Sequence, residues 1–215
     1  MVAYDLEGVL VDDISIWVKL SRAFGTDGID PGLREEYLAG RISYREWSDL
    51  VVSRWKGCDL GIIEEIVRST RLMEGAIETV SSLREKGVRQ VIITNSISHL
   101  ADAVGEMLGI GKEWIRSNVL GVEDGRLTGT VEYYHSWEDK LSSLNYFASL
   151  IGCGMEEVAV VGDGINDIEI LQAAGLGIAF DPKDPGVCDA ADVVVRRKDL
   201  REILGWVERP EVKDL

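Results

Sequence analysis

Cysteine, histidine and proline are scarce in this sequence of 215 residues, which holds three, two and four of them respectively. The cysteines are far apart, and none pairs with another cysteine or a histidine at the spacing of a zinc site. They also lack the pattern of a disulfide framework, so we expect free thiols. His99 and His135 are the two histidines of the sequence, so few residues could support catalysis by histidine.

Basic residues are outnumbered, because 23 Lys and Arg face 38 Asp and Glu, a formal net charge of −15. Such a surface repels nucleic-acid phosphates and anionic membranes, so neither is expected as a partner. No apolar run approaches the roughly 18 residues of a membrane span, and Asp5 interrupts any signal-peptide core. We therefore expect a cytoplasmic protein. The negative electrostatic field of this surface would also repel a small anionic substrate, unless a metal ion or nearby cations reverse the field locally.

Short apolar runs alternate with helical patterns, which predicts an α/β fold with a doubly wound, Rossmann-like parallel sheet. Strands are expected over residues 2–4, 91–93, 158–161, 177–180 and 193–195, and helices over 74–86, 97–108, 138–151, 167–174 and from 199. Runs at 119–122 and 126–131, separated by Glu-Asp-Gly, predict a β-hairpin.

Residues 12–72 differ in character, with helical patterns at 14–24, 31–39, 43–56 and 60–70 and no clear strand. Trp17, Trp47 and Trp55 fall here, which predicts a small helical unit with its own core. We expect two domains: an α/β core over 1–11 and 73–215, and an inserted helical cap over 12–72.

Acidic residues follow two of the predicted strands: Asp5 and Glu7 follow the first, and Asp163 and Asp167 follow the strand over 158–161. Parallel strands end at one edge of the sheet, where ligands bind. Clustered carboxylates raise one another's pKa unless a cation offsets them, and oxygen-only ligands favour Mg²⁺. Each pair alone is equally typical of a strand end or a helix cap, so the prediction rests on their combination.

Two further residues suit phosphate chemistry. Thr94 follows the strand over 91–93, and a hydroxyl near a helix start can hold a phosphoryl oxygen. Lys140 lies in the first turn of a predicted helix, where its positive charge interacts unfavourably with the helix dipole. A bound phosphate would compensate for this unfavourable interaction. A carboxylate can attack phosphorus once these charges are screened, and a second carboxylate can protonate the leaving alkoxide and then activate water.

The ordered series Asp5-Leu6-Glu7-Gly8-Val9-Leu10, Val91-Ile92-Ile93-Thr94, Lys140 and Gly162-Asp163-Gly164-Ile165-Asn166-Asp167 resembles the haloacid dehalogenase superfamily. Within it the chain is similar to phosphoserine phosphatases over nearly its whole length. The resemblance implies a Mg²⁺-dependent phosphatase that hydrolyses a small phosphorylated metabolite through an aspartyl-phosphate. The expected partners are that phosphomonoester and, at most, a second copy of the chain as a homodimer.

The resemblance also implies a role for each matched residue. Asp5 would be the nucleophile and a metal ligand, and Glu7 would be the acid/base, with its backbone carbonyl touching the metal. Asp163 would be a metal ligand, and Asp167 would support the metal shell. The remaining matched positions are expected to bind the phosphoryl group or line the substrate site: Thr94, Lys140, Asn95, Asn166 and Gly8.

Two departures from the family pattern bear on substrate. Glu7 stands where most members have Asp, which keeps a carboxylic acid in place. Ile14 and Val51 stand where the serine-specific members have a Glu and an Arg that hold the substrate's amine and carboxylate. Each charged hydrogen bond lost costs about 1.5–3 kcal/mol, so we predict that phosphoserine is a poor substrate.

Other interpretations share these motifs. Phosphotransfer to an acceptor alcohol uses every one of them, and a phospho-accepting receiver module carries a similar set in a different order. A dehalogenase does not need the second acidic pair. In the cap, Tyr44, Trp47 and Trp55 are expected to pack as core, the alternative being contact with the leaving group. Its cations are candidates for substrate selection: Arg41, Arg45, Arg54 and Lys56.

Overall fold

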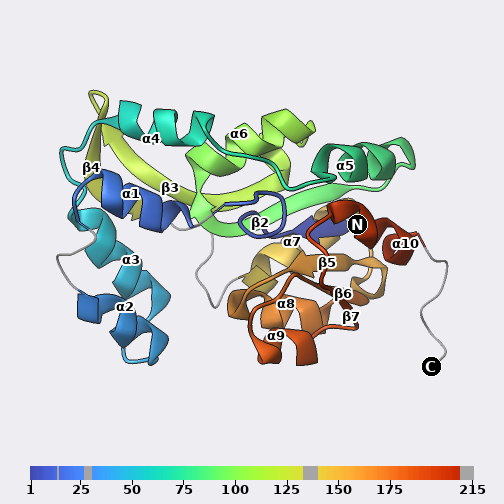
Figure 1. Cartoon of the computed structure of the whole chain (residues 1–215). Coiled ribbons are helices and arrows are strands. Elements are labelled where there is room, and N and C mark those ends of the chain that lie inside the picture. The colour runs from blue at the N-terminus through green and yellow to red at the C-terminus, as the bar shows by residue number, and fades with distance from the viewer. Residues whose placement is uncertain (14, 27–30, 133–139, 209–215) are drawn as a thin grey trace.

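The computed structural model describes residues 1–13, 15–26, 31–132 and 140–208. Within them the chain forms one sheet in the order β4-β3-β2-β1-β5-β6-β7, parallel except for the antiparallel pair β3–β4 (Figure 1). The strands are β1 (Val2–Tyr4), β2 (Gln90–Ile97), β3 (Ile115–Glu123), β4 (Arg126–Glu132), β5 (Ala159–Gly162), β6 (Leu176–Phe180) and β7 (Val193–Val195). The predicted α/β fold and the hairpin are confirmed.

Helices cover both faces of the sheet, because successive strand residues point to opposite sides and both sides are apolar. In β1, Val2 and Tyr4 pack into one hydrophobic cluster and Ala3 into the other. The first cluster lies under α5 (Ala76–Glu85), α6 (Ser98–Leu108), η4 (Leu200–Ile203) and α10 (Leu204–Val207). The second lies under α7 (Lys140–Ile151), α8 (Ile168–Ala173) and α9 (Pro185–Asp189), as Figure 1 shows.

Four helices lie between β1 and α5 and gather at one end of the molecule (Figure 1). They are α1 (Ile16–Ala23), α2 (Pro31–Leu38), α3 (Tyr44–Ser53) and α4 (Leu60–Arg68). Their predicted positions are confirmed, although each helix is shorter than expected. Ser43 starts α3 through a capping box with Glu46, and Trp55 lies beyond the end of that helix.

The prediction that residues 12–72 have their own core is wrong. Trp17, Trp55 and Ile63 belong to the same hydrophobic cluster as Val2 and Ile92 of the sheet. The reason is the β3–β4 hairpin, which reaches the helices and pairs with the segment between α3 and α4. The N–H of Gly57 donates to Leu127 O at 2.8 Å, and the N–H of Leu127 donates to Cys58 O at 3.0 Å.

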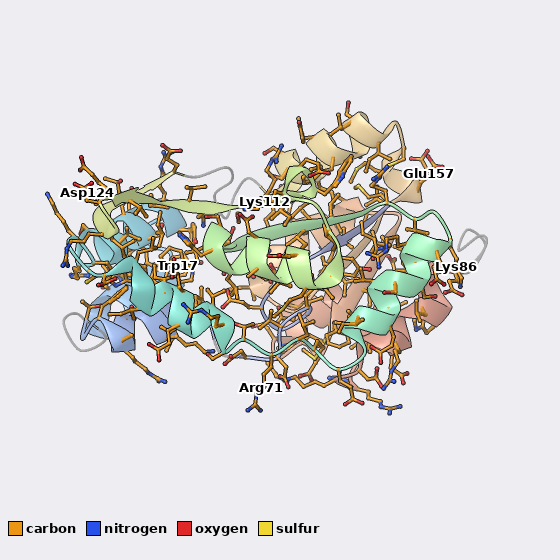
Figure 2. All side chains as sticks on the ribbon, turned by 90° about the horizontal axis from the view of Figure 1, so that it is seen from above. Trp17, Arg71, Lys86, Lys112, Asp124 and Glu157 are labelled. Atoms are coloured by element: carbon orange, nitrogen blue, oxygen red, sulfur yellow. The ribbon has the colours of Figure 1, made fainter. Side chains whose placement is uncertain are left out.

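Figure 2 shows the same arrangement from another side. Trp17 lies at the end of the molecule that carries the hairpin turn at Asp124, away from Lys86 (Figure 2). The hairpin thus joins the helical segment to the sheet and continues the apolar core between them.

The carboxyl end of β2 differs from the sequence expectation. Strand β2 runs on to Ile97 instead of ending before Thr94, and its pairing with β3 shifts register between Ile93 and Ile97. Strand β1 ends at Tyr4, as predicted, so Asp5 and Glu7 follow it. Helix α9 and three short 3₁₀ turns were not predicted: η1 (Lys112–Trp114), η2 (Met155–Glu157) and η3 (Ile165–Asp167).

The three cysteines are free thiols, as predicted. Across the described ranges, no helix has both the length and the apolar character needed to span a membrane.

We predict that Trp55→Ala is among the most destabilising single changes in the helical segment. The Trp55 side chain is fully buried, stacks on Trp17 with ring centroids 5.5 Å apart, and donates through Nε1 to Thr26 Oγ1 at 3.2 Å. Loss of a buried tryptophan costs about 3–5 kcal/mol, which urea unfolding measures. Leu50→Ala is the matched control, because Leu50 is 45% exposed. Equal unfolding midpoints for the two variants would contradict this account of the core.

Candidate functional site

Three carboxylates meet at the carboxyl edge of the sheet. Asp5 follows β1, whereas Asp163 and Asp167 follow β5, and ligand oxygens of all three lie within 4.8 Å of one another. Asp5 is held in place by its N–H, which donates to Val161 O at 2.9 Å. Strands β1 and β5 are neighbours in the sheet, so residues 158 positions apart in sequence come together here.

The ammonium group of Lys140 lies between two of these carboxylates. Lys140 is the first residue of α7, and its Nζ donates to Asp5 Oδ1 at 3.0 Å and to Asp167 Oδ1 at 2.7 Å. The side chain is only 1% exposed. Burial by itself lowers the pKa of Lys140, but the charges of Asp167 and Asp5 reverse this and hold the pKa above its usual value. The lysine is therefore charged at neutral pH.

One ammonium does not offset three carboxylates. Burial, with Asp5 and Asp167 as further causes, raises the pKa of Asp163 to about 8. Burial also raises the pKa of Asp167, against the effect of Lys140. Asp167 Oδ2 accepts the N–H groups of Asp163 and Gly164, both at 3.1 Å, which fixes the turn after β5. The excess negative charge and the oxygen-only donors fit a hard divalent cation.

Gly8 allows Asp163 to approach the turn after β1. Its φ is +90°, a conformation that favours glycine, and a Cβ at this position would lie 2.2 Å from Asp163 Oδ2. Gly8 was expected to line the substrate site, whereas the structure places it against the Asp163 carboxylate.

The carboxyl group of Glu7 is separate from the other three. Its Oε1 accepts the backbone N–H of Ile16, the first residue of α1. Burial raises the pKa of Glu7 to about 7; the hydrogen bond from Ile16 opposes this shift, and the charge of Asp5 adds to it. Glu7 can therefore change protonation state near neutral pH. The carboxylates that could hold a metal ion are those of Asp5, Asp163 and Asp167, and the Glu7 side chain is not among them.

Thr94 and Asn95 lie in the last part of β2. The N–H of Ser96 donates to Thr94 Oγ1 at 3.1 Å, so the proton of the threonine hydroxyl is left to donate elsewhere. Both polar atoms of the Asn95 side chain are buried, and neither has a hydrogen-bond partner among the described residues. Because buried polar groups are normally satisfied, this amide is available to a ligand.

The main-chain carbonyl of Asn95 joins the helical segment to the sheet. It accepts hydrogen bonds from Tyr44 Oη at 2.8 Å, Trp17 Nε1 at 3.2 Å and Asn118 Nδ2 at 2.9 Å. Sequence reasoning did not identify Tyr44 or Asn118 as part of this junction. The available signal was an asparagine directly before the apolar run at 119–122, since a polar side chain that is buried in a strand needs partners.

A cavity of about 730 Å³ opens above these groups and extends beneath α1, α2 and α3. Its floor is polar and consists of Asp5, Glu7, Thr94, Asn95, Ser96, Asp163, Gly164 and Asn166, with Ile165 beside them. Asn166 therefore lies where the sequence placed it, next to the substrate space. Val51 lines the cavity from α3 with an apolar side chain. Ile14 lies outside the described residues.

Comparison with known proteins explains this arrangement. The family model of haloacid dehalogenase-like hydrolases matches residues 1–175. The chain belongs to this family. Because a family of hydrolases matches most of the chain, the interpretation as a receiver module is wrong.

Within the family the chain is similar to phosphoserine phosphatases. It is 29% identical to the enzyme of Methanocaldococcus jannaschii, with 97% of each chain covered, and 30% identical to that of Halobacterium salinarum, with 93% of each covered. A solved structure of a phospho-aspartyl intermediate analogue of phosphoserine phosphatase superposes with a TM-score of 0.85 at 28% identity. That match covers 96% of this chain and 98% of the other. The predicted phosphatase assignment and the predicted resemblance are confirmed.

We predict that Asp163→Asn stabilises the metal-free protein. The pKa of Asp163 is about 8 in the folded state and roughly 3.9 in an unfolded chain, so the folded state binds this proton more tightly. The group therefore destabilises the fold increasingly as the pH rises between these values. In the presence of a chelator, the free energy of unfolding of Asp163→Asn should exceed that of the wild type. The difference between the two proteins should grow from about pH 5 to about pH 8.

Asp189→Asn is the control for this experiment, because Asp189 is exposed at the end of α9 and is not among the clustered carboxylates. Its difference from the wild type should not grow with pH. An Asp163→Asn protein less stable than the wild type at about pH 8 would contradict the like-charge repulsion that we infer.

Proposed function

We propose that the protein is a Mg²⁺-dependent phosphomonoesterase that works through an aspartyl-phosphate on Asp5. The observation that carries the proposal is the buried Lys140, whose ammonium holds Asp5 and Asp167 while Asp163 stays within 4.8 Å of both. This arrangement immobilises the Asp5 carboxylate in the floor of a cavity large enough for a substrate.

The donor set suits Mg²⁺ because every side-chain ligand atom is a carboxylate oxygen. Asp5, Asp163 and Asp167 would hold the ion, with the backbone carbonyl of Glu7. When bound, Mg²⁺ would neutralise the phosphoryl charge beside the nucleophile.

In the first half of the reaction, a carboxylate oxygen of Asp5 attacks phosphorus and the ester P–O bond breaks. Lys140 orients that carboxylate through its 3.0 Å contact. The Thr94 hydroxyl and the unsatisfied Asn95 amide donate to the phosphoryl oxygens. Protonated Glu7 gives its proton to the leaving alkoxide.

In the second half, the ionised Glu7 takes a proton from a water molecule that attacks the phosphorus of the aspartyl-phosphate. The bond from phosphorus to Asp5 breaks, which frees inorganic phosphate and restores the carboxylate. A group that donates and then accepts one proton works best with a pKa near the working pH. The raised pKa of Glu7, about 7, suits both steps.

The division of the chain follows from this chemistry. In our proposal, the α/β core over 1–11 and 73–215 binds the phosphoryl group, and the helical cap over 12–72 encloses the leaving group. The substrate is a small phosphorylated metabolite. The apolar Val51 in the cavity wall supports the prediction that phosphoserine is a poor substrate. The cytoplasmic location and a homodimer stay predictions.

We predict that Asp5→Asn lowers hydrolysis of a generic aryl phosphate by at least about 10⁴-fold, because the nucleophile is lost. Phosphate release measures this, and circular dichroism checks the fold. Asp189→Asn, which neutralises an exposed carboxylate, should keep wild-type turnover. A turnover number of Asp5→Asn close to that of the wild type would contradict the mechanism. Addition of an acceptor alcohol, followed by a search for its phosphate ester, distinguishes phosphotransfer from hydrolysis.

We predict that chelation removes the activity and that Mg²⁺ restores it. Mg²⁺ at about a hundred times its dissociation constant should also stabilise the wild type by about 2.7 kcal/mol, as thermal unfolding reports. Asp163→Asn should lose most of that stabilisation because one ligand is gone. An equal Mg²⁺-induced shift in both proteins would place the ion elsewhere.

A further inference from the structure

The cavity extends well beyond the groups that handle phosphate. Its volume of about 730 Å³ lies within the roughly 300–1,000 Å³ of pockets that bind drug-sized ligands. A phosphorylated amino acid with a three-carbon skeleton would fill a small part of it. The remaining space lies against α1, α2 and α3, and its lining bears on the leaving group of the substrate.

The wall supplied by these helices is mainly aromatic and aliphatic. Its aromatic and aliphatic residues are Trp17, Val18, Leu33, Tyr37, Tyr44, Trp47 and Val51, and its polar residues are Ser15, Ser21, Arg22, Thr26 and Arg54. Apolar walls of this kind bind apolar or aromatic ligands, and a few polar groups fix the orientation. The sequence favoured core packing for the aromatics. That holds for Trp55, which is fully buried, whereas Trp47 is half-buried and borders the cavity.

The aromatic rings brace one another. Tyr37 and Trp47 stack with centroids 5.4 Å apart, and Trp17 lies 5.4 Å from Trp47 and 5.5 Å from Trp55. Trp17 and Tyr44 are further fixed by their hydrogen bonds to Asn95 O. A wall held in this way is formed before the ligand arrives, which lowers the entropic cost of binding.

The charges around the cavity are divided between floor and wall. The carboxylates Asp5, Glu7 and Asp163 all lie in the floor, where the metal and the phosphoryl group are proposed to bind. Among the described residues, the wall contributes Arg22 and Arg54 and no acid. Arg54 follows Val51 by three positions and so lies on the same side of α3. Within the described part of this wall, an ammonium group on the leaving group meets no carboxylate, whereas an anionic group meets the side chains of Arg22 and Arg54.

Building on the proposed function, we propose that the leaving alcohol carries an aromatic group with an anionic substituent. The ring would lie against Trp47 and its neighbours, and the anion would face Arg54 and Arg22. Phosphoserine, which is small and carries an ammonium group, fits neither part.

A series of primary alkyl phosphates tests this with the wild-type enzyme and Mg²⁺. The series consists of propyl phosphate, phenylpropyl phosphate, and the para-carboxy and para-aminomethyl derivatives of phenylpropyl phosphate. All four release a primary alcohol of similar acidity, and they differ in the ring and the ring substituent that would contact the wall. We expect kcat/KM to rise by about tenfold or more from propyl to phenylpropyl phosphate. It should rise about tenfold again for the carboxy derivative and fall for the aminomethyl one.

Three variants locate the effect. Trp47→Ala should shrink the ratio of kcat/KM between phenylpropyl and propyl phosphate by about tenfold. Arg54→Gln should remove the preference for the carboxy over the aminomethyl derivative. Leu50→Ala, an exposed position on the same helix and outside the cavity lining, should leave every ratio unchanged.

The outcomes separate this inference from the proposed function. Equal values for propyl and phenylpropyl phosphate, a preference for the aminomethyl derivative, or a preference for phosphoserine over the whole series would overturn the inference while leaving the phosphatase intact. Failure to release phosphate from any substrate, a generic aryl phosphate included, would instead overturn the proposed function.

Discussion

The ammonium group of Lys140 lies between the carboxylates of Asp5 and Asp167, and the site depends on this buried contact. It ties the start of α7 to the turns after β1 and β5, three segments that are distant in sequence. A charge this deeply buried is tolerated only with partners, so each of the three groups needs the other two. Lys140 pairs with Asp5 and Asp167, and the raised pKa of Asp163 indicates that a further cation at this edge of the sheet would favour its ionised form. In the proposed function, bound Mg²⁺ together with Lys140 would offset the acidity of the chain, −15, where the phosphoryl group binds.

Three hydrogen bonds join the helices between β1 and α5 to the groups of the proposed site. The first N–H of α1 donates to Glu7, and the side chains of Tyr44 and Trp17 donate to the carbonyl of Asn95. The proposed acid/base and the end of β2 are therefore oriented by the segment that also forms the wall of the cavity. Recognition of the leaving group and delivery of its proton are, in this account, properties of one packed unit.

Local sequence patterns predicted the sheet, the hairpin and the order of the helices, since apolar alternation and glycine positions are local signals. They also placed Asp5, Asp163 and Asp167 at one edge, because parallel strands share their carboxyl ends. They failed at β2, where polar Thr94 and Asn95 stay in a strand whose pairing shifts register. The core shared by the helical segment and the sheet was also missed, because it depends on long-range packing against the β3–β4 hairpin.

Trapping the intermediate tests the central claim most directly. The enzyme is mixed with a phosphomonoester and Mg²⁺, quenched in acid during turnover, and digested for mass spectrometry. The account predicts one added phosphoryl group on the peptide that carries Asp5, absent when Mg²⁺ is removed by a chelator. Phosphate release with the Asp5 peptide unmodified throughout, or with the phosphoryl group on another residue, would contradict it.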